Sequence, residues 1–192
     1  MKKLILFGLA FTLALGAAYA QVRQEISVEE FENVDLDGNI RLYLQSSSKA
    51  EVVIEAKKEA HIADYDIEFR NGTLSIKHAG DRFGSTPKID VYVTHPGLYK
   101  VDVDGLVHVY TNDPVESKRF KLKGDGMIRG EIEVNVDELE IALDGMCKLS
   151  VAGEAEFSDL SPDGMGKIDA RGLSTSKYNQ QSYGLASIKV GN

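Results

Sequence analysis

Five short blocks determine the fold, and each begins with a turn and continues with alternating apolar and polar residues. They are DGLVHVYT at residues 104–111, DGMIRGEI at 125–132, DGMCKLSV at 144–151, DGMGKIDA at 163–170 and YGLASIKV at 183–190. From one of these glycines to the next, the steps are 21, 19, 19 and 20 residues. An earlier copy, DGNIRLYL at 37–44, stands apart. Self-similarity at a fixed period of this length predicts stacked structural repeats.

Apolar or small residues alternate with polar ones after each turn. In the second block, Ile128 and Ile132 alternate with Arg129 and Glu131. A period of two is typical of a strand with one buried and one exposed face. A second short strand of the same parity precedes each turn, which leaves no room for a helix. The sequence therefore predicts an all-β fold, a single-stranded parallel β-helix (solenoid) with rungs of about 20 residues from about residue 102 to 192.

The N-terminal part is less regular and is predicted to form a hairpin and a cap. Residues 66–77, DIEFRNGTLSIK, place Asn71-Gly72 between alternating flanks. This dipeptide is preferred in the type I′ turn of a two-residue hairpin. No stretch reads as a linker between two domains, so we expect one domain over residues 21–192.

The first 20 residues are typical of a secretory signal peptide. A basic head, Met1–Lys3, precedes an apolar segment at 4–17 and the small-x-small site Ala18-Tyr19-Ala20. The apolar segment is too short for a retained membrane span. We therefore expect cleavage before Gln21 and export to the periplasm, the cell surface or the medium of a bacterium, without a membrane-spanning segment in the mature chain.

The composition excludes several classes of function. The chain carries 22 Lys and Arg against 30 Asp and Glu, and loss of Lys2 and Lys3 leaves a net charge of 20 − 30 = −10. An acidic surface of this kind disfavours nucleic acid as a partner. The single Cys147 cannot form an intramolecular disulfide and is predicted to be a small core residue. Four scattered histidines and one cysteine predict no zinc site.

The order of several different segments along the chain resembles that in the head GIN domain of autotransporter adhesins, a bacterial family. The pieces are FENVDLDGNIRLYL at 31–44, NGTLSIKH at 71–78 and PKIDVYVTHPGLYKVDVDG at 87–105, followed by the rungs. The resemblance implies a single-stranded β-helix without a shared catalytic set, and adhesion is its suggested role. Family rungs commonly continue after the glycine with small residues, whereas this chain has Leu or Met there.

Stacking of the rungs predicts three rows of like residues, of which the first is acidic. This row consists of Asp104, Asp125, Asp144 and Asp163. An Asp-Gly pair suits a tight corner, because the carboxylate caps backbone N–H groups and glycine accepts a positive φ. The alternative is a weak calcium site, since spaced carboxylates suit a hard cation.

The second row is basic and lies three residues after each glycine. It consists of Arg41, His108, Arg129, Lys148 and Lys167. A line of cations could follow a sulfated or uronic polysaccharide, with arginine supplying forked contacts to the acidic groups. Alternatively, the row is the solvated face of the strands and offsets the charge of the acidic row.

The third row is apolar and follows each glycine directly. It consists of Leu106, Met127, Met146, Met165 and Leu185. Strict alternation places these side chains on the exposed face, where a contiguous apolar strip would mark a contact with another protein or a second copy of the chain. The alternative is that they fold over the turn and belong to the core.

These features predict an exported, non-catalytic binding or adhesion protein that presents its rows to a glycan, a matrix protein or an envelope partner. We assign no catalytic or cofactor-binding residue. A structural envelope protein without a soluble ligand is the alternative. A polysaccharide lyase-like enzyme is disfavoured, because acid–base pairs such as Asp125 with Arg129 recur on successive rungs, whereas an enzyme needs one catalytic centre.

Overall fold

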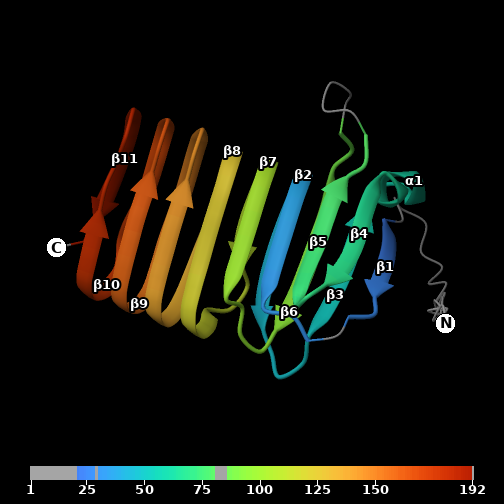
Figure 1. Ribbon diagram of the computed structural model, residues 1–192, viewed down its shortest axis with the longest axis horizontal. Coiled ribbons are helices and arrows are strands. Elements are labelled where there is room, and N and C mark those ends of the chain that lie inside the picture. Colours follow the sequence, from blue (N-terminus) through green and yellow to red (C-terminus); the bar gives the residue numbers. More distant parts are fainter. Residues whose placement is uncertain (1–20, 29, 81–85, 192) are drawn as a thin grey trace.

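The computed structural model describes residues 21–28, 30–80 and 86–191 (Figure 1). The predicted signal peptide at 1–20 lies outside the described residues. The N-terminal elements are β1 (Val22–Ile26), β2 (Asn33–Ser46), β3 (Glu51–Ala56), α1 (Glu59–Ala63), β4 (Tyr65–Arg70), β5 (Thr73–His78) and β6 (Ile89–His95). The C-terminal strands are β7 (Lys100–Thr111), β8 (Val115–Leu143), β9 (Met146–Pro162), β10 (Met165–Gln180) and β11 (Leu185–Val190).

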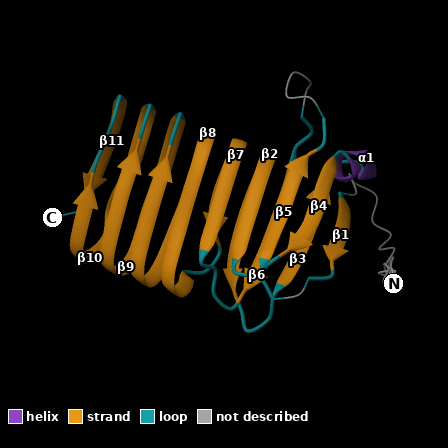
Figure 2. Cartoon of the chain, viewed as in Figure 1, coloured by secondary structure: helices purple, strands orange, loops and turns teal. Residues whose placement is uncertain are grey.

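The strands form one mixed sheet. Its order is β1-β3-β6-β2-β7-β8-β9-β10-β11, with β5 beside β2 and β4 beside β5. From β2 through β7 to β11, neighbouring strands are parallel. Among the described strands, antiparallel pairs occur only in the N-terminal part, at β1–β3, β3–β6 and β4–β5. Helix α1 is the one α-helix within the described residues (Figure 2), so the prediction of an all-β chain is confirmed.

The repeat copies lie side by side in register. Asp104 and Gly105 of β7 pair with Asp125 and Gly126 of β8, and the residues that follow keep the same alignment. The detached copy at 37–44 joins this ladder, because its Asp-Gly turn pairs with Asp104-Gly105 although the two glycines are 67 positions apart in the sequence. Strands β3 to β6 are thus inserted between the first and second members of one ladder.

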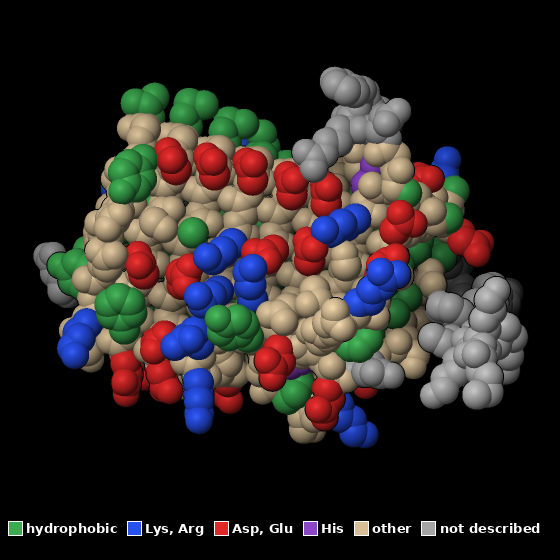
Figure 3. Space-filling model, viewed as in Figure 1, with side chains coloured by type: hydrophobic (Ala, Val, Ile, Leu, Met, Phe, Trp, Pro, Cys, Tyr) green, Lys and Arg blue, Asp and Glu red, His purple; other side chains and the backbone are tan. Residues whose placement is uncertain are grey.

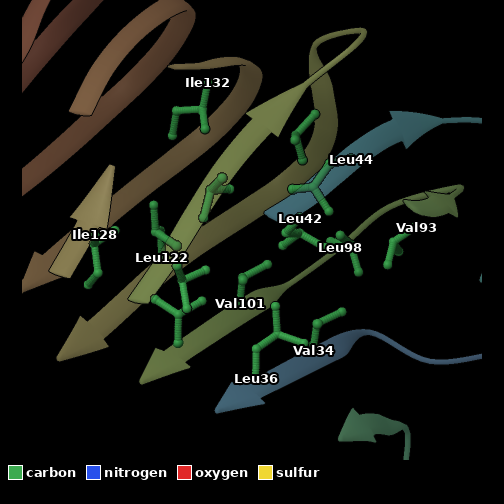
Figure 4. Close-up of a cluster of buried hydrophobic side chains, with 14 of the residues drawn as sticks. Val34, Leu36, Leu42, Leu44, Val93, Leu98, Val101, Leu122, Ile128 and Ile132 are labelled. Carbon is green, nitrogen blue, oxygen red and sulfur yellow. The ribbon is translucent and has the colours of Figure 1, made fainter. Parts of the chain in front are cut away.

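Alternation buries one face of the repeat strands β2 and β7 to β10, as predicted, whereas the terminal strand β11 alternates only between half-buried and exposed residues. Val107 and Ile128 are fully buried register partners, and Cys147 on β9 is 5% exposed. Burial raises the pKa of the Cys147 thiol, in agreement with the prediction that it is a core residue. Leucines from the segments before the turns, such as Leu122, fill the space opposite these side chains (Figure 4).

The long C-terminal strands are bent (Figure 1). Strand β8 has 29 residues, of which the earlier part pairs with β7 and the later part with β9. Its alternation of buried and exposed residues is interrupted at Asp137 and Glu138, two adjacent exposed residues. In Figure 1, strands β8, β9 and β10 curve around the lower edge of the molecule.

The predicted N-terminal hairpin is present. Strands β4 and β5 pair antiparallel, from Tyr65 opposite His78 to Arg70 opposite Thr73. The φ angles are +50° at Asn71 and +70° at the glycine that follows, which fits the two positive φ angles of a type I′ turn. The turn chemistry predicted at 66–77 is therefore confirmed.

Tyr65 ties this hairpin to β2 and to the segment before β6. Its hydroxyl accepts a hydrogen bond from the Asn39 backbone N–H at 3.1 Å and donates one to the Pro87 carbonyl oxygen at 2.8 Å. Burial of the side chain raises the pKa of Tyr65 to about 12. The ring lies so close to Gly38 that a Cβ there would come within 2.8 Å of it.

Candidate functional site

The apolar row forms an exposed ridge, called the apolar ridge below. Its members pair in register from β7 to β11 and are Leu106, Met127, Met146, Met165 and Leu185. Leu106 is 38% exposed, and the next member, Met127, is half-buried. From there the exposed fraction increases toward the C-terminus, to 52% at Met165 and 79% at Leu185. Figure 3 shows hydrophobic side chains in a line along the upper edge over these strands. The structure therefore places the row on the surface and not in the core.

The acidic row runs beside the apolar ridge, one residue before each glycine. Figure 3 shows acidic side chains in a line directly below the hydrophobic ones. The carboxylates of Asp144 and Asp163 each accept a hydrogen bond from the following glycine N–H, at 2.6 and 2.7 Å. These bonds are the corner-capping contacts expected of an Asp-Gly turn. Within the described ranges, no group of three or more His, Cys, Asp or Glu side chains could hold a metal ion.

The basic row lies in one register line, but its first member has a structural partner. Arg41 Nε donates to Asp90 Oδ1 at 2.6 Å, and the Asp90 side chain is only 9% exposed. This hydrogen bonding raises the pKa of Arg41. Asp90 lies on β6, beside β2. Sequence reasoning missed the pair, because β6 is not one of the repeat copies.

The other end of the basic row is also paired. Lys167 Nζ lies 2.6 Å from Asp169 Oδ2, and Arg171 donates to both oxygens of the same carboxylate at 2.8 Å. Hydrogen bonds from Arg171 and Lys167 hold the pKa of Asp169 well below its usual range. Arg129 and Lys148 are exposed, and within the described part of the chain neither contacts a carboxylate.

His108 lies between the two ends of the basic row. Burial lowers its pKa, and the nearby cations Lys88, Arg129 and Arg41 lower it further. We therefore expect the imidazole to be neutral at pH 7. Its ring meets the edge of Tyr110, with 6.3 Å between the ring centroids. Arg129 and Lys148 therefore carry most of the positive charge that the basic row exposes to solvent.

Cations on the segments before the turns are engaged with carboxylates. Lys121 and Lys123 contact the two oxygens of Glu140 at 2.6 and 2.8 Å, and Arg119 contacts Glu138 at 2.6 Å. Hydrogen bonds from Lys121 and Lys123 lower the pKa of Glu140. Surface pairs of this kind contribute little to stability, but they leave less charge for a ligand. This contrast singles out the surface that carries Arg129 and Lys148.

A stack of three tyrosines lies two residues beyond the basic row. Tyr92 of β6, Tyr43 of β2 and Tyr110 of β7 are register partners. Their ring centroids are 4.8 and 5.5 Å apart, with interplanar angles of 11° and 22°. Sequence reasoning missed this stack. The aligned blocks at 37–44 and 104–111 both carry Tyr at their seventh position, which is a signal for two rings but not for the third.

An open groove of about 580 Å³ crosses β8, β9 and β10 next to the tyrosine stack. Glu131, Ser150 and Asp169 form one row of its lining, in register across the three strands. The other side is lined by Glu133, Ala152, Arg171 and Gly172, with Thr111 at the β7 end. Between the rows lie Ile132 and Val151, whose side chains are buried in the core. Sequence reasoning did not predict this groove.

Comparison with known proteins identifies the fold and the family. The chain is similar to a "putative adhesin" from Bacteroides fragilis, at a TM-score of 0.81 and 19% identity over 89% of this chain and 80% of that one. A "putative adhesin" from Parabacteroides distasonis has a TM-score of 0.63 at 18% identity, over 89% and 82% of the two chains. A "putative lipid binding protein" from the same species reaches 0.65 at 15% identity, over 88% and 81%. No protein of curated function matches.

Within the residues that the structure describes, no helix has the length and hydrophobicity needed to cross a bilayer. Residues 30–192 match the family model described as "Putative auto-transporter adhesin, head GIN domain". This match extends over the ladder of β2 and β7 to β11 and over the inserted strands. The chain belongs to this head GIN domain family.

Proposed function

We propose that the chain is a non-catalytic binding protein of the adhesion class, which presents rows of stacked residues to a glycan, a matrix protein or an envelope component. The observation that carries this proposal is the repetition of exposed side chains of one type on successive strands, from Leu106 to Leu185. The name of the family supports it. A regular surface suits an extended partner, because each strand adds an equivalent contact.

The same rows support the proposal that the C-terminal strands wind as a parallel β-helix with rungs of about 20 residues. Their parallel register and the bends of β8 to β10 favour this arrangement. We also propose one domain over residues 21–192. A crystal structure in which each long strand encloses one core would agree, and a flat sheet with an exposed second apolar face would contradict the β-helix. A single cooperative unfolding transition would support one domain.

Export is proposed from the signal peptide at 1–20, and a role outside the cell fits the adhesin family. Fractionation of the source cells distinguishes periplasm, cell surface and medium. Recovery of the chain in the cytosol with its N-terminus intact would contradict the proposal. No catalytic residue is proposed, because Asp125 with Arg129 resembles Asp144 with Lys148 on the next strand.

The test of the binding function is an array of polysaccharides and matrix proteins probed with labelled residues 21–192, in calcium and in chelator. We expect a specific hit that weakens when Arg129 and Lys148 are both replaced by Gln. A hit that disappears only in chelator would assign calcium to the acidic row. A blank array would instead favour a structural envelope protein without a soluble ligand.

A second candidate is a protein contact along the apolar ridge. Its residues are contiguous and, apart from the half-buried Met127, exposed, which is typical of an interaction surface. The acidic row beside it favours a partner that combines apolar and cationic groups. Two ridges placed face to face would bring like charges together, so a second copy of the chain is the less favoured partner. Met127, Met146 and Met165 replaced together by Ser should abolish such association, measured by sedimentation or pull-down.

A further inference from the structure

The groove across β8 to β10 combines hydrogen-bond acceptors with a shallow polar surface, and Tyr110 lies beside it, next to Thr111 in sequence and paired in register with Glu131. We propose that it is a carbohydrate-binding subsite, in which a pyranose ring packs against Tyr110 and its hydroxyl groups bind Glu131 and Glu133. This inference rests on the binding function proposed above and gives that function a ligand class. It concerns a different surface from the apolar ridge.

The size and lining of the groove suit a chain of sugar rings. Its volume of about 580 Å³ lies within the usual range of small-molecule sites. Ser150, Ala152 and Gly172 line it with small side chains or none, so that a flat ligand can approach the backbone of β9 and β10. The groove is open and crosses three strands, which leaves room for a polymer to continue beyond it.

Two carboxylates provide the specificity for hydroxyl groups. Glu131 and Glu133 are exposed on either side of Ile132, and within the described residues neither contacts a cation. An ionised carboxylate only accepts hydrogen bonds and can bind two donors, which adjacent sugar hydroxyls supply. Thr111 Oγ1 already accepts the Glu133 backbone N–H at 2.9 Å, so its hydroxyl hydrogen is directed to another acceptor. Donors and acceptors are therefore both available at this end of the groove.

Tyr110 supplies the apolar contact that sugar recognition also needs. It is the register partner of Glu131 on the neighbouring strand. Tyr43 stacks on one side of its ring, at 5.5 Å between centroids, and β8 is the neighbouring strand on the other side. The C–H groups of a pyranose ring carry partial positive charge and pack on the negative face of an aromatic ring. The stack behind Tyr110 holds that ring in place.

The cations beside the groove distinguish two kinds of ligand that both contain pyranose rings, namely acidic and neutral glycans. Arg129 and Lys148 lie on the same strand face, two residues before Glu131 and Ser150. A uronic acid unit could direct its carboxylate to them while its hydroxyls bind the glutamates. A neutral glycan would use the hydroxyl and ring contacts alone. The shared feature is the pyranose ring, and the test separates the two kinds of ligand.

The test uses purified residues 21–192 with cellohexaose as the neutral probe and oligogalacturonate as the acidic probe. Titration calorimetry gives the affinities, and saturation-transfer NMR identifies which sugar protons lie near the protein. The variant E131Q/E133Q removes the two carboxylate charges and keeps the side-chain size. Its matched control is E154Q/E156Q, because Glu154 and Glu156 are also exposed, two residues apart, on β9 outside the groove lining.

We expect at least one probe to bind, and E131Q/E133Q to weaken that binding by about tenfold or more while the control does not. Y110L should weaken it similarly and reduce saturation transfer to the ring C–H protons. If R129Q/K148Q weakens only oligogalacturonate, the natural ligand is acidic. If it weakens neither probe, the ligand is neutral.

Unchanged affinity in E131Q/E133Q would overturn the subsite. So would the failure of both probes and of every polysaccharide on the array. In either case, a matrix protein hit on the array would leave the adhesion function intact, because that hit does not depend on the groove. A blank for polysaccharides and proteins together would remove both proposals. Circular dichroism and the melting temperature of each variant confirm that it is folded.

Discussion

The N-terminal strands up to β6 and the C-terminal strands from β7 onward achieve stability in different ways. The N-terminal part depends on individual contacts between unlike residues, such as Tyr65 with Pro87 and Arg41 with Asp90. The C-terminal part repeats one arrangement, in which each strand lies in register on the one before. Repetition places like residues together on the surface as well as in the core. The rows proposed as binding surfaces therefore extend over the C-terminal strands.

The largest expected effect is a methyl group placed within the stacked turns. A Cβ at Gly126 would lie 2.4 Å from the Gly105 carbonyl oxygen of the neighbouring turn, and its φ is +104°. We expect Gly126→Ala to lower the free energy of unfolding by about 4 kcal/mol through overpacking and backbone strain.

The matched control is Gly72→Ala in the N-terminal hairpin. It also has a positive φ, +70°, but no atom lies within 4 Å of the added methyl group. This change should cost only about 1 kcal/mol, the backbone penalty alone. Urea denaturation of both variants measures the difference. Equal losses would mean that φ, and not the contact between turns, fixes glycine at these positions.

The next effect concerns Tyr65 in the N-terminal part. Replacement by Phe leaves the Asn39 N–H and the Pro87 carbonyl without this partner, which should cost about 2 kcal/mol at pH 7. Ionisation of tyrosine begins near pH 10 in the unfolded chain, whereas the pKa of Tyr65 in the folded protein is about 12. Stability should therefore be unaffected by this group below pH 10 and fall between pH 10 and 12, by about 2 to 3 kcal/mol in total.

Tyr65→Phe should lack that part of the alkaline loss. Urea denaturation at pH 7, 10 and 11.5 compares the variant with the natural chain. A parallel decline of the two proteins above pH 10 would contradict the assignment to Tyr65. The C-terminal variants should retain the full pH dependence of the natural chain.

A smaller effect distinguishes two arginines of the same row. Arg41→Gln leaves the nearly buried Asp90 without its forked partner and should cost about 1.5 kcal/mol. Arg129→Gln changes an exposed side chain that has no carboxylate partner among the described residues, and the loss should stay within about 0.5 kcal/mol. Thermal unfolding of both variants tests this. A comparable loss at Arg129 would show that the C-terminal part of the row is also structural.

A small effect is also expected at the apolar ridge. Replacing Met127, Met146 and Met165 together by Ser removes two exposed side chains and one, Met127, that is half-buried. The free energy of unfolding should change by less than about 1 kcal/mol in total. Ile128→Ala, one position along and fully buried, should cost about 3 kcal/mol. A large loss in the triple variant would mean that the ridge is part of the core.

The repeat determined most of what could be predicted from the sequence. Period and alternation were enough to predict the strands, the stacked turns and the register of the basic row, because equivalent positions of successive copies pair with one another. The position of Leu106 and its equivalents was left open, since a corner can interrupt alternation. The structure shows that it does not do so there.

The remaining features arise where unlike segments meet. Asp90 and Tyr92 lie on β6, which pairs with β2 although no repeat relates the two strands. The groove depends on how the strand backbone runs between Glu131 and Glu133, and an alternating pattern does not encode that path. The contact between Gly105 and Gly126 likewise depends on the separation of two turns. Residue types alone do not determine such distances.

The in-register stacking of β7 to β11 has a consequence for how such a protein can change during evolution. Duplication of one unit of about 20 residues would lengthen the array by one strand without disturbing its neighbours, because each unit contacts mainly the units on either side. The same event would add one residue to every surface row at once. Weak contacts would then multiply through avidity, and the strength of adhesion could be adjusted by gene length and not by the optimisation of any single residue.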